Sequence, residues 1–204
     1  MVQAFTKLLT FAEFILEYSN NPRYELADGE LIDVEVTGPH AVVGGKLATK
    51  LGIAITHAEL PWVIPRTCLI RPFAETATAR RPDIVVLDET VLHHEPFWEH
   101  EPVIALGKSI KLVVEVVSTN WRDDYLTKLR DYEEIGILEY WIIDYLALGG
   151  IRYIGSPKQP TISIHLLIEG EYQVKQFQDD ARIISSTFPD LNLTAQQVFK
   201  AGNI

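Results

Sequence analysis

The sequence predicts an α/β fold in a single domain spanning residues 1–204, built on a mixed β-sheet that helices cover. The first observation is the order of a valine-rich apolar run at 111–118, a helical pattern at about 121–135 and a further apolar run at 139–146. The second is the absence of any repeat, low-complexity segment or linker long enough to separate two domains. The third is length, because 204 residues bury a substantial core without disulfide support.

The N-terminal part of the chain contains a helix, a hairpin and a second helix. The capping-box pattern TFAE opens a short amphipathic helix at about 10–20. The segment RYELADGELIDVEV at 23–36 is typical of a β-hairpin, with Ala-Asp-Gly supplying a left-handed turn. Pro39 suits the first turn of a helix, and apolar spacing continues that helix to about His57.

Strand-like runs dominate the rest of the chain. Short β-like segments precede the run at 111–118, namely WVIP, CLIRPFA and RPDIVVLD. The helix at about 121–135 stops at Gly136, which is a suitable C-cap. After the third apolar run we expect an antiparallel C-terminal extension made of TISIHLLIEG, EYQVKQF and ARIISS. A last helix, capped by Thr194, runs to about Ala201.

Composition excludes several classes of protein. Cys68 is the single cysteine, so neither an internal disulfide nor a cysteine-based metal cluster can form, which fits a reducing compartment. The first 20 residues carry acidic side chains within their apolar stretch and lack a small-residue cleavage site, unlike a signal peptide. No run approaches the roughly 18 apolar residues of a membrane span. We therefore expect a soluble, cytoplasmic protein with no membrane partner.

The charge distribution allows limited contact with phosphate. The formal net charge is −10, which argues against strong non-specific coating of DNA. The segment 40–81, however, has six basic and two acidic side chains, a net charge of +4. A locally basic surface on an acidic protein is compatible with occasional phosphate contacts.

Glu115 lies in the middle of the apolar run KLVVEVVS at 111–118. Burying an unpaired ionised carboxylate is costly, so this side chain is neutral, paired or beside a cation. It could face solvent on an edge strand or pair with a structural arginine. A second carboxylate, Asp83, directly precedes the apolar run at 84–87, and acidic residues at the margins of two neighbouring strands can converge. A few oxygen ligands with several retained waters are what Mg²⁺ prefers.

Lys128 follows Asp124 by four residues, on one face of the predicted helix. One interpretation is a surface ion pair, worth about 0.2–0.5 kcal/mol. The other places Lys128 over the two carboxylates, where an ammonium orients a water nucleophile or neutralises charge that develops on phosphate. The spacing leaves both open.

The order of these motifs resembles that of the Uma-type family of restriction-endonuclease-like proteins, within the PD-(D/E)XK nuclease superfamily. The shared elements are TFAEFI, RYELADGELI, the histidine in GPHAVVGGKLATKL, the PD and EVV motifs, S-x-x-x-x-x-D-x-x-x-K, EYWIID and FPDLNLTAQQVF. The resemblance spans Thr10 to Phe199. It implies a restriction-endonuclease-like fold, in which helices flank a central mixed sheet that carries an N-terminal helix and hairpin and a C-terminal antiparallel extension.

The resemblance implies a metal-dependent endonuclease that hydrolyses phosphodiester bonds in DNA. Asp83 matches the motif aspartate and Glu115 the motif glutamate, and together they would hold Mg²⁺ or Mn²⁺, with the main-chain carbonyl of Val116 as a further ligand. The superfamily's lysine normally lies two residues after the glutamate, where this chain has Val117. The matching residue is Lys128, supplied by the following helix, which would help position the water nucleophile and stabilise the transition state.

Four further residues are candidates for the same site. His40, at a helix N-terminus, could contact phosphate or act in proton transfer, or could simply cap the helix. Glu30 is a candidate fourth metal ligand, with Glu25 as the competing residue, because alternation along strands means that the two need not point alike. Asp124 could hydrogen-bond Lys128 or reach the metal through water.

Two pairs of residues flank the motifs. Arg80 and Arg81 directly precede the motif aspartate and are natural phosphate contacts, with surface solvation as the alternative for at least one of them. Tyr140 and Trp141, in EYWIID, favour core packing over stacking on bases.

Two other classes of function stay open. A catalytically inactive protein with the nuclease fold would bind nucleic acid or a protein partner without cutting, and the acidic net charge is compatible with this. A non-nuclease hydrolase or structural oligomer would keep the acidic pair for stability. Metal binding that depends on Asp83 and Glu115 separates an endonuclease from the latter class, and cleavage of DNA separates it from the former. Enzymes that cut both strands commonly work as symmetric dimers, so we expect a homodimer.

Overall fold

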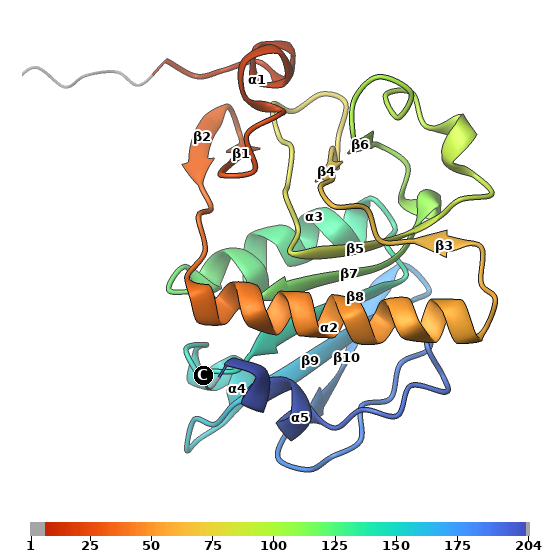
Figure 1. The fold of residues 1–204 in the computed structure, drawn as a ribbon. Helices are drawn as coiled ribbons and strands as arrows, with labels where there is room; N and C mark the ends of the chain where they lie inside the picture. The colour runs from red at the N-terminus through yellow and green to blue at the C-terminus, as the bar shows by residue number, and fades with distance from the viewer. Residues whose placement is uncertain (1–6, 203–204) are drawn as a thin grey trace, which may run out of the picture.

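The computed structural model describes residues 7–202, and a six-stranded mixed sheet forms its centre. Along the sheet the strands are β10 (Glu171–Phe177), β9 (Thr161–Ile168), β8 (Glu139–Asp144), β7 (Ile110–Val116), β5 (Ile84–Asp88) and β3 (Trp62–Val63). Strands β7 and β8 run parallel, and the other neighbouring pairs are antiparallel. Helix α2 (Gly38–His57) crosses one face and α3 (Lys128–Glu134) lies against the other (Figure 1). The predicted α/β fold is therefore confirmed.

A smaller layer, made of elements from the N-terminal half of the chain and of β6, packs above β5 in Figure 1. Its members are α1 (Phe11–Tyr18), the hairpin of β1 (Tyr24–Ala27) and β2 (Glu30–Asp33), and the parallel pair of β4 (Leu69–Ile70) and β6 (Val103–Ile104). The predicted capping box is confirmed, since Thr10 and Glu13 each accept a hydrogen bond from the other's backbone. The hairpin turn is left-handed as predicted, with φ of 49° at Asp28 and 85° at Gly29.

Helix α2 confirms the helix predicted from Pro39 to His57 and supplies one side of the core. Every fourth residue of its apolar face is buried against the sheet: Val43, Leu47, Leu51 and Ile55. Helix α5 (Ala195–Phe199), which begins at the predicted Thr194 cap, joins the same cluster, and a 3₁₀ turn (Lys200–Gly202) follows it. Between residues 7 and 202, no helix has the length and apolarity needed to cross a membrane.

The helix predicted at about 121–135 is present, but one of its turns is wider than expected. A π-helical turn at Asp123–Thr127 precedes α3, and Gly136, with φ of 86°, follows its end. Single π-helical turns inside α-helices are frequent at functional sites. Three shorter helical segments complete the described part of the chain: 3₁₀ turns at Leu92–His94 and Gly107–Ser109, and α4 (Ile151–Ile154).

The C-terminal extension contains β9 and β10 as predicted, but the prediction of a third strand at ARIISS is wrong. That segment makes a single β-bridge, from Arg182 to Thr194. At the end of this segment, the buried carboxylate of Glu139 accepts hydrogen bonds from the Ser185 hydroxyl and from the backbone N–H groups of Ser186 and Thr187. The backbone N–H of Ser186 is therefore not free to pair with a strand.

Candidate active site

The two motif carboxylates meet at one end of the sheet. Ile84 pairs with Val114 in the antiparallel register of β5 and β7, so Asp83 lies beside the end of β7. The Val116 N–H donates to Asp83 Oδ2, with 2.7 Å between nitrogen and oxygen. The convergence expected from the margins of the two apolar runs is present, because antiparallel pairing brings the start of β5 to the end of β7.

Glu115 is buried and has a partner on each carboxylate oxygen. The Tyr132 hydroxyl donates to Oε1 at 2.7 Å, and Lys128 Nζ lies 3.0 Å from Oε2. Burial raises the pKa of Glu115, and the charge of Lys128 acts against that rise. Glu115 therefore neither faces solvent nor pairs with an arginine. Tyr132 was not predicted as a site residue, although its position four residues after Lys128 places both side chains on one face of α3.

Lys128 lies among three carboxylates. Besides Glu115, its Nζ is 3.6 Å from Asp124 and 4.0 Å from Glu25. Burial lowers the pKa of Lys128, but these carboxylates outweigh burial and raise the pKa well above its usual value. Burial raises the pKa of Asp124 to about 7. Since Lys128 and Asp124 are both buried, the interpretation as a surface ion pair is wrong.

His40 connects α2 to the ends of β5 and β7. Its Nε2 lies 2.7 Å from the Val116 carbonyl oxygen and 3.2 Å from Asp83 Oδ2. Burial lowers the pKa of His40, but the hydrogen bonds to Asp83 and Val116 outweigh it and raise the pKa above its usual value. The N-cap of α2 is Thr37, and His40 bonds strands of the sheet instead, so the capping interpretation is wrong.

Glu25, the competitor of Glu30, is fully buried, but its oxygens are taken by arginines. Its Oε1 lies 3.2 Å from Arg80 Nη1, and its Oε2 accepts the Arg81 N–H. Arg80 also pairs with Asp131 at 2.8 Å and is 1% exposed. The side chain of Arg81 donates inside the protein as well, to Tyr24, Thr67 and Ser19. The prediction that Arg80 and Arg81 contact phosphate is therefore not supported, because both guanidinium groups have internal partners.

Glu30 does not join the site. Pairing of Glu25 with Ile32 and of Ala27 with Glu30 puts both glutamates on one face of the hairpin, but Glu30 is beside the turn. Two residues of strand, about 7 Å, separate its level from that of Glu25. Glu30 is exposed and does not line the cavity that contains Asp83 and Glu115, so the prediction that Glu30 is a metal ligand is wrong.

One cavity of about 740 Å³ brings the other predicted residues together. Asp83, Glu115, Lys128 and His40 line it, as do Asp124 and the main chain at Val116. Tyr140 and Trp141 are fully buried in the core on opposite faces of the sheet, as the sequence favours.

The donor set of this cavity fits a hard divalent cation. Asp83 and Glu115 offer carboxylate oxygens and Val116 a carbonyl oxygen, and Mg²⁺ is typically held by one or two carboxylates plus water and substrate phosphate. In the part of the chain from 7 to 202, no three His, Cys, Asp or Glu side chains form a preassembled metal-ligand group. The two carboxylates and the Val116 carbonyl are therefore the candidate oxygen donors that this cavity offers to a cation.

Comparisons with known proteins agree with the motifs. A family model for Uma2, described as "Putative restriction endonuclease", matches residues 11–196. A crystal structure from Anabaena variabilis, described as a putative nuclease belonging to DUF820, superimposes with a TM-score of 0.68 at 16% identity, covering 95% of this chain and 99% of that one. That likeness supports the fold alone. None of the curated proteins compared matches the chain. The resemblance read from the motifs is confirmed, and the chain belongs to the Uma2 family.

Proposed function

We propose that this protein is a metal-dependent endonuclease that hydrolyses phosphodiester bonds in DNA. The observation that supports the proposal is the convergence of Asp83, Glu115 and Lys128 in one cavity, from two strands and a helix far apart in the sequence. A buried lysine among carboxylates is costly to maintain as a purely structural feature, so its position at a cavity wall favours a role in chemistry.

Asp83, Glu115 and the Val116 carbonyl would hold Mg²⁺ or Mn²⁺. When bound, such an ion polarises a phosphoryl oxygen and lowers the pKa of a bound water. The protein's contribution is to fix the ligands: Tyr132 and Lys128 hold Glu115, and the Val116 N–H holds Asp83.

Lys128 supplies positive charge at the cavity wall, and His40 supplies a ring nitrogen within hydrogen-bond distance of two candidate ligands. The carboxylates around Lys128 keep it protonated, so its ammonium can stabilise negative charge on the phosphate as the bond breaks. His40 carries a buried Nδ1 with no hydrogen-bond partner among the described residues, and its Nε2 contacts two candidate ligands. It can therefore orient Asp83 and the Val116 carbonyl and accept or release a proton.

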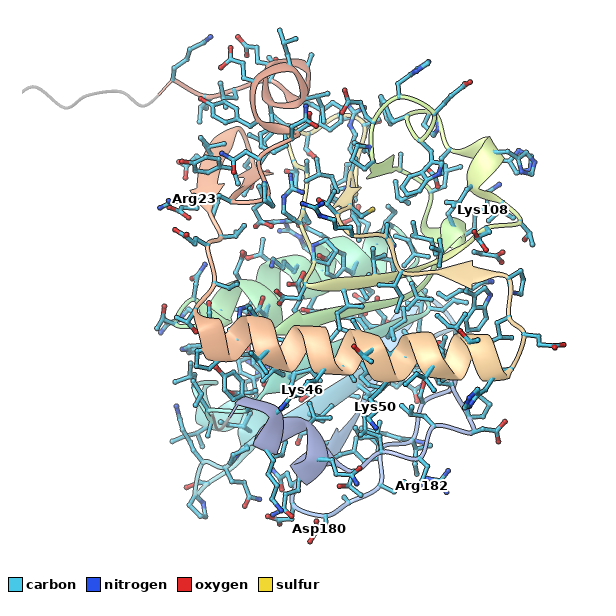
Figure 2. The ribbon with its side chains drawn as sticks, in the orientation of Figure 1. Arg23, Lys46, Lys50, Lys108, Asp180 and Arg182 are labelled. Carbon is cyan, nitrogen blue, oxygen red and sulfur yellow. The ribbon has the colours of Figure 1, made fainter. Side chains whose placement is uncertain are left out.

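The test combines metal binding and cleavage. Calorimetric titration of Mn²⁺ and Mg²⁺ into wild type, Asp83→Asn and Glu115→Gln should show binding that either substitution weakens. The same samples, incubated with plasmid DNA, should lose at least about 100-fold in nicking rate. Asp180→Asn is the matched control, because Asp180 is exposed and lies far from β1, β2 and the start of α2 (Figure 2).

Two results would reject the proposal. Nicking retained by Asp83→Asn or Glu115→Gln would exclude these carboxylates from catalysis. Metal binding by wild type without cleavage of either plasmid DNA or a single-stranded oligonucleotide would favour the alternative that this member of the family binds nucleic acid or a protein partner without cutting it.

A further inference from the structure

The geometry of the cavity mouth points to an unpaired strand of nucleic acid as the substrate, bound through Arg66 at a phosphate next to the one that is cut. This inference rests on the proposed function and narrows it. Three observations support it: one guanidinium without an internal partner, the internal pairing of the other two cavity arginines, and two exposed apolar side chains.

Arg66 is the cavity arginine that has no internal partner. It is exposed and lines the cavity, and within residues 7–202 no carboxylate lies within 4.0 Å of its guanidinium. Arg23 pairs with Asp33 and Glu35, at 2.7 and 2.9 Å, and Arg81 bonds internally. An exposed guanidinium in a cavity with catalytic carboxylates is suited to a phosphate, which it binds through paired N–H donors.

The residue after Arg66, Thr67, hydrogen-bonds through its side chain to the segment that precedes Asp83. Thr67 accepts a hydrogen bond of 2.6 Å from Arg81 Nη1, and Arg81 is two residues before Asp83. The backbone N–H of Arg81 donates to the buried Glu25. The loop that carries Arg66 is therefore held relative to Asp83, which is what a positioning contact to a neighbouring phosphate requires.

The charges around the cavity fit one strand better than two. Proteins that bind duplex DNA strongly neutralise about 6–10 phosphates, whereas this cavity offers one arginine without an internal partner. Asp33 and Glu35 also line the cavity, and both pair with Arg23, so these three side chains carry a net charge of −1 and offer no free cation to a second backbone. The formal net charge of −10 acts in the same direction.

Two apolar side chains at the mouth offer contacts that only unpaired bases can use. Val36 and Leu146 both line the cavity and are 43% and 53% exposed. They flank Thr37 and Tyr145, whose side chains interact, so the two segments are neighbours. In a duplex the base faces are stacked on one another, but in a single strand they are available to apolar side chains.

The experiment compares one labelled oligonucleotide as a free strand and annealed to its complement, with Mn²⁺ and full-length protein. We expect kcat/KM to be at least tenfold higher for the free strand. Arg66→Ala should raise KM for that strand about tenfold, as for loss of one charge-assisted hydrogen bond, and leave kcat within threefold. It should also lower the slope of log kcat/KM against log salt concentration by about 0.7.

Arg182→Ala is the matched control. Arg182 is exposed, and Figure 2 shows it at the opposite end of the molecule from Arg23. This variant should keep the wild-type KM and salt slope. Circular dichroism would verify that both variants are folded.

The outcomes separate this inference from the proposed function. Equal or faster cleavage of the duplex, or an Arg66→Ala variant that behaves like Arg182→Ala, would overturn the inference and leave the endonuclease intact. If wild type cuts neither form, the proposed activity fails, and anisotropy of the labelled strand then decides. Binding of the free strand that Arg66→Ala weakens would still support the strand site, and no binding would reject it.

Discussion

Replacing Lys128 with methionine should destabilise the protein strongly at neutral pH. The substitution keeps most of the side-chain volume but removes the ammonium that lies 3.0 Å from Glu115 and 3.6 Å from Asp124. Glu115 is 2% exposed and Asp124 is 6% exposed, so both carboxylates are poorly solvated in the folded protein. Removing one member of a buried ion pair costs about 3–5 kcal/mol, because a buried charge stays uncompensated.

The cost should depend on pH in a defined direction. Burial already raises the pKa of Glu115 and of Asp124, the latter to about 7, and the variant lacks the charge of Lys128, which opposes that rise in both groups. An acid whose pKa is higher in the folded state binds more protons there, so stability falls as the pH rises between the unfolded and folded pKa values. The variant should therefore lose about 3–5 kcal/mol at pH 8 and less than half of that at pH 5.

Urea unfolding at pH 5 and pH 8, followed by circular dichroism, measures both quantities. The midpoint of the variant should shift at unchanged m-value, since the folded structure keeps its size. Lys108→Met is the control, because Lys108 is exposed and lies on a 3₁₀ turn remote from the site (Figure 2). It should change stability by less than about 0.5 kcal/mol.

The result that refutes this reasoning is a small or pH-independent effect. If Lys128→Met costs under about 1 kcal/mol at pH 8, the carboxylates around Lys128 are not held as charged partners. If the cost is the same at both pH values, protonation of Glu115 and Asp124 does not compensate the missing charge. Either result would also weaken the proposed role of Lys128 in stabilising charge on phosphate.

Three further predictions concern stability. Burial lowers the pKa of His165 from 6.5 to about 4, so between these pH values the unfolded chain binds more protons than the folded protein, and the free energy of unfolding should fall by about 3 kcal/mol as the pH drops from 6.5 to 4. His165→Phe should flatten this pH dependence in urea titrations at pH 4, 5.5 and 7. A Cβ at Gly107 would overlap the Ile135 carbonyl, so Gly107→Ala should destabilise the protein by about 1–3 kcal/mol and lower its Tm by several degrees. An unchanged Tm would show that the segments carrying Gly107 and Ile135 can move apart. Thr10→Ala removes the N-cap of α1 and should cost about 1 kcal/mol in the same assay, with Thr90→Ala, whose hydroxyl bonds Asp88 in an exposed turn, as a comparison.

Local patterns predicted the elements that depend on local rules. The Thr10 capping box, the helix cap at Thr194, the Asp28-Gly29 turn and the extent of α2 all follow from interactions within a few residues, and the structure contains each of them. The meeting of Asp83 with Glu115 was also predictable, because both lie at ends of neighbouring apolar runs. Motifs of this kind constrain a fold without any knowledge of distant contacts.

Long-range contacts decided the features that the sequence did not predict. The ARIISS segment has the composition of a strand, but Glu139, more than 40 residues earlier, accepts the backbone N–H of its last residue, Ser186. Arginine is usually exposed, but Arg80 is buried in an ion pair with Asp131, which lies 51 positions away along the chain and 2.8 Å away in space. Such pairs leave no periodic signal, because each residue alone is compatible with solvent.

This chain has Val117 at the position where the superfamily normally has its lysine, and the packing of α3 on the sheet explains the difference. Val117 is 1% exposed and packs in the cluster that contains Tyr132 and Ile142, beneath the helix. A lysine at 117 would bury its stem and its charge in that apolar layer, whereas Lys128 reaches the same carboxylate from the helix above, with Asp124 beside it. The π-helical turn at Asp123–Thr127 lies directly before Lys128, and the ammonium ends 3.0 Å from Glu115. The chain thus keeps a lysine ammonium beside the carboxylates, while valine occupies the strand position. A lysine at 117 and a lysine at 128 are alternative ways to place one positive charge beside Glu115.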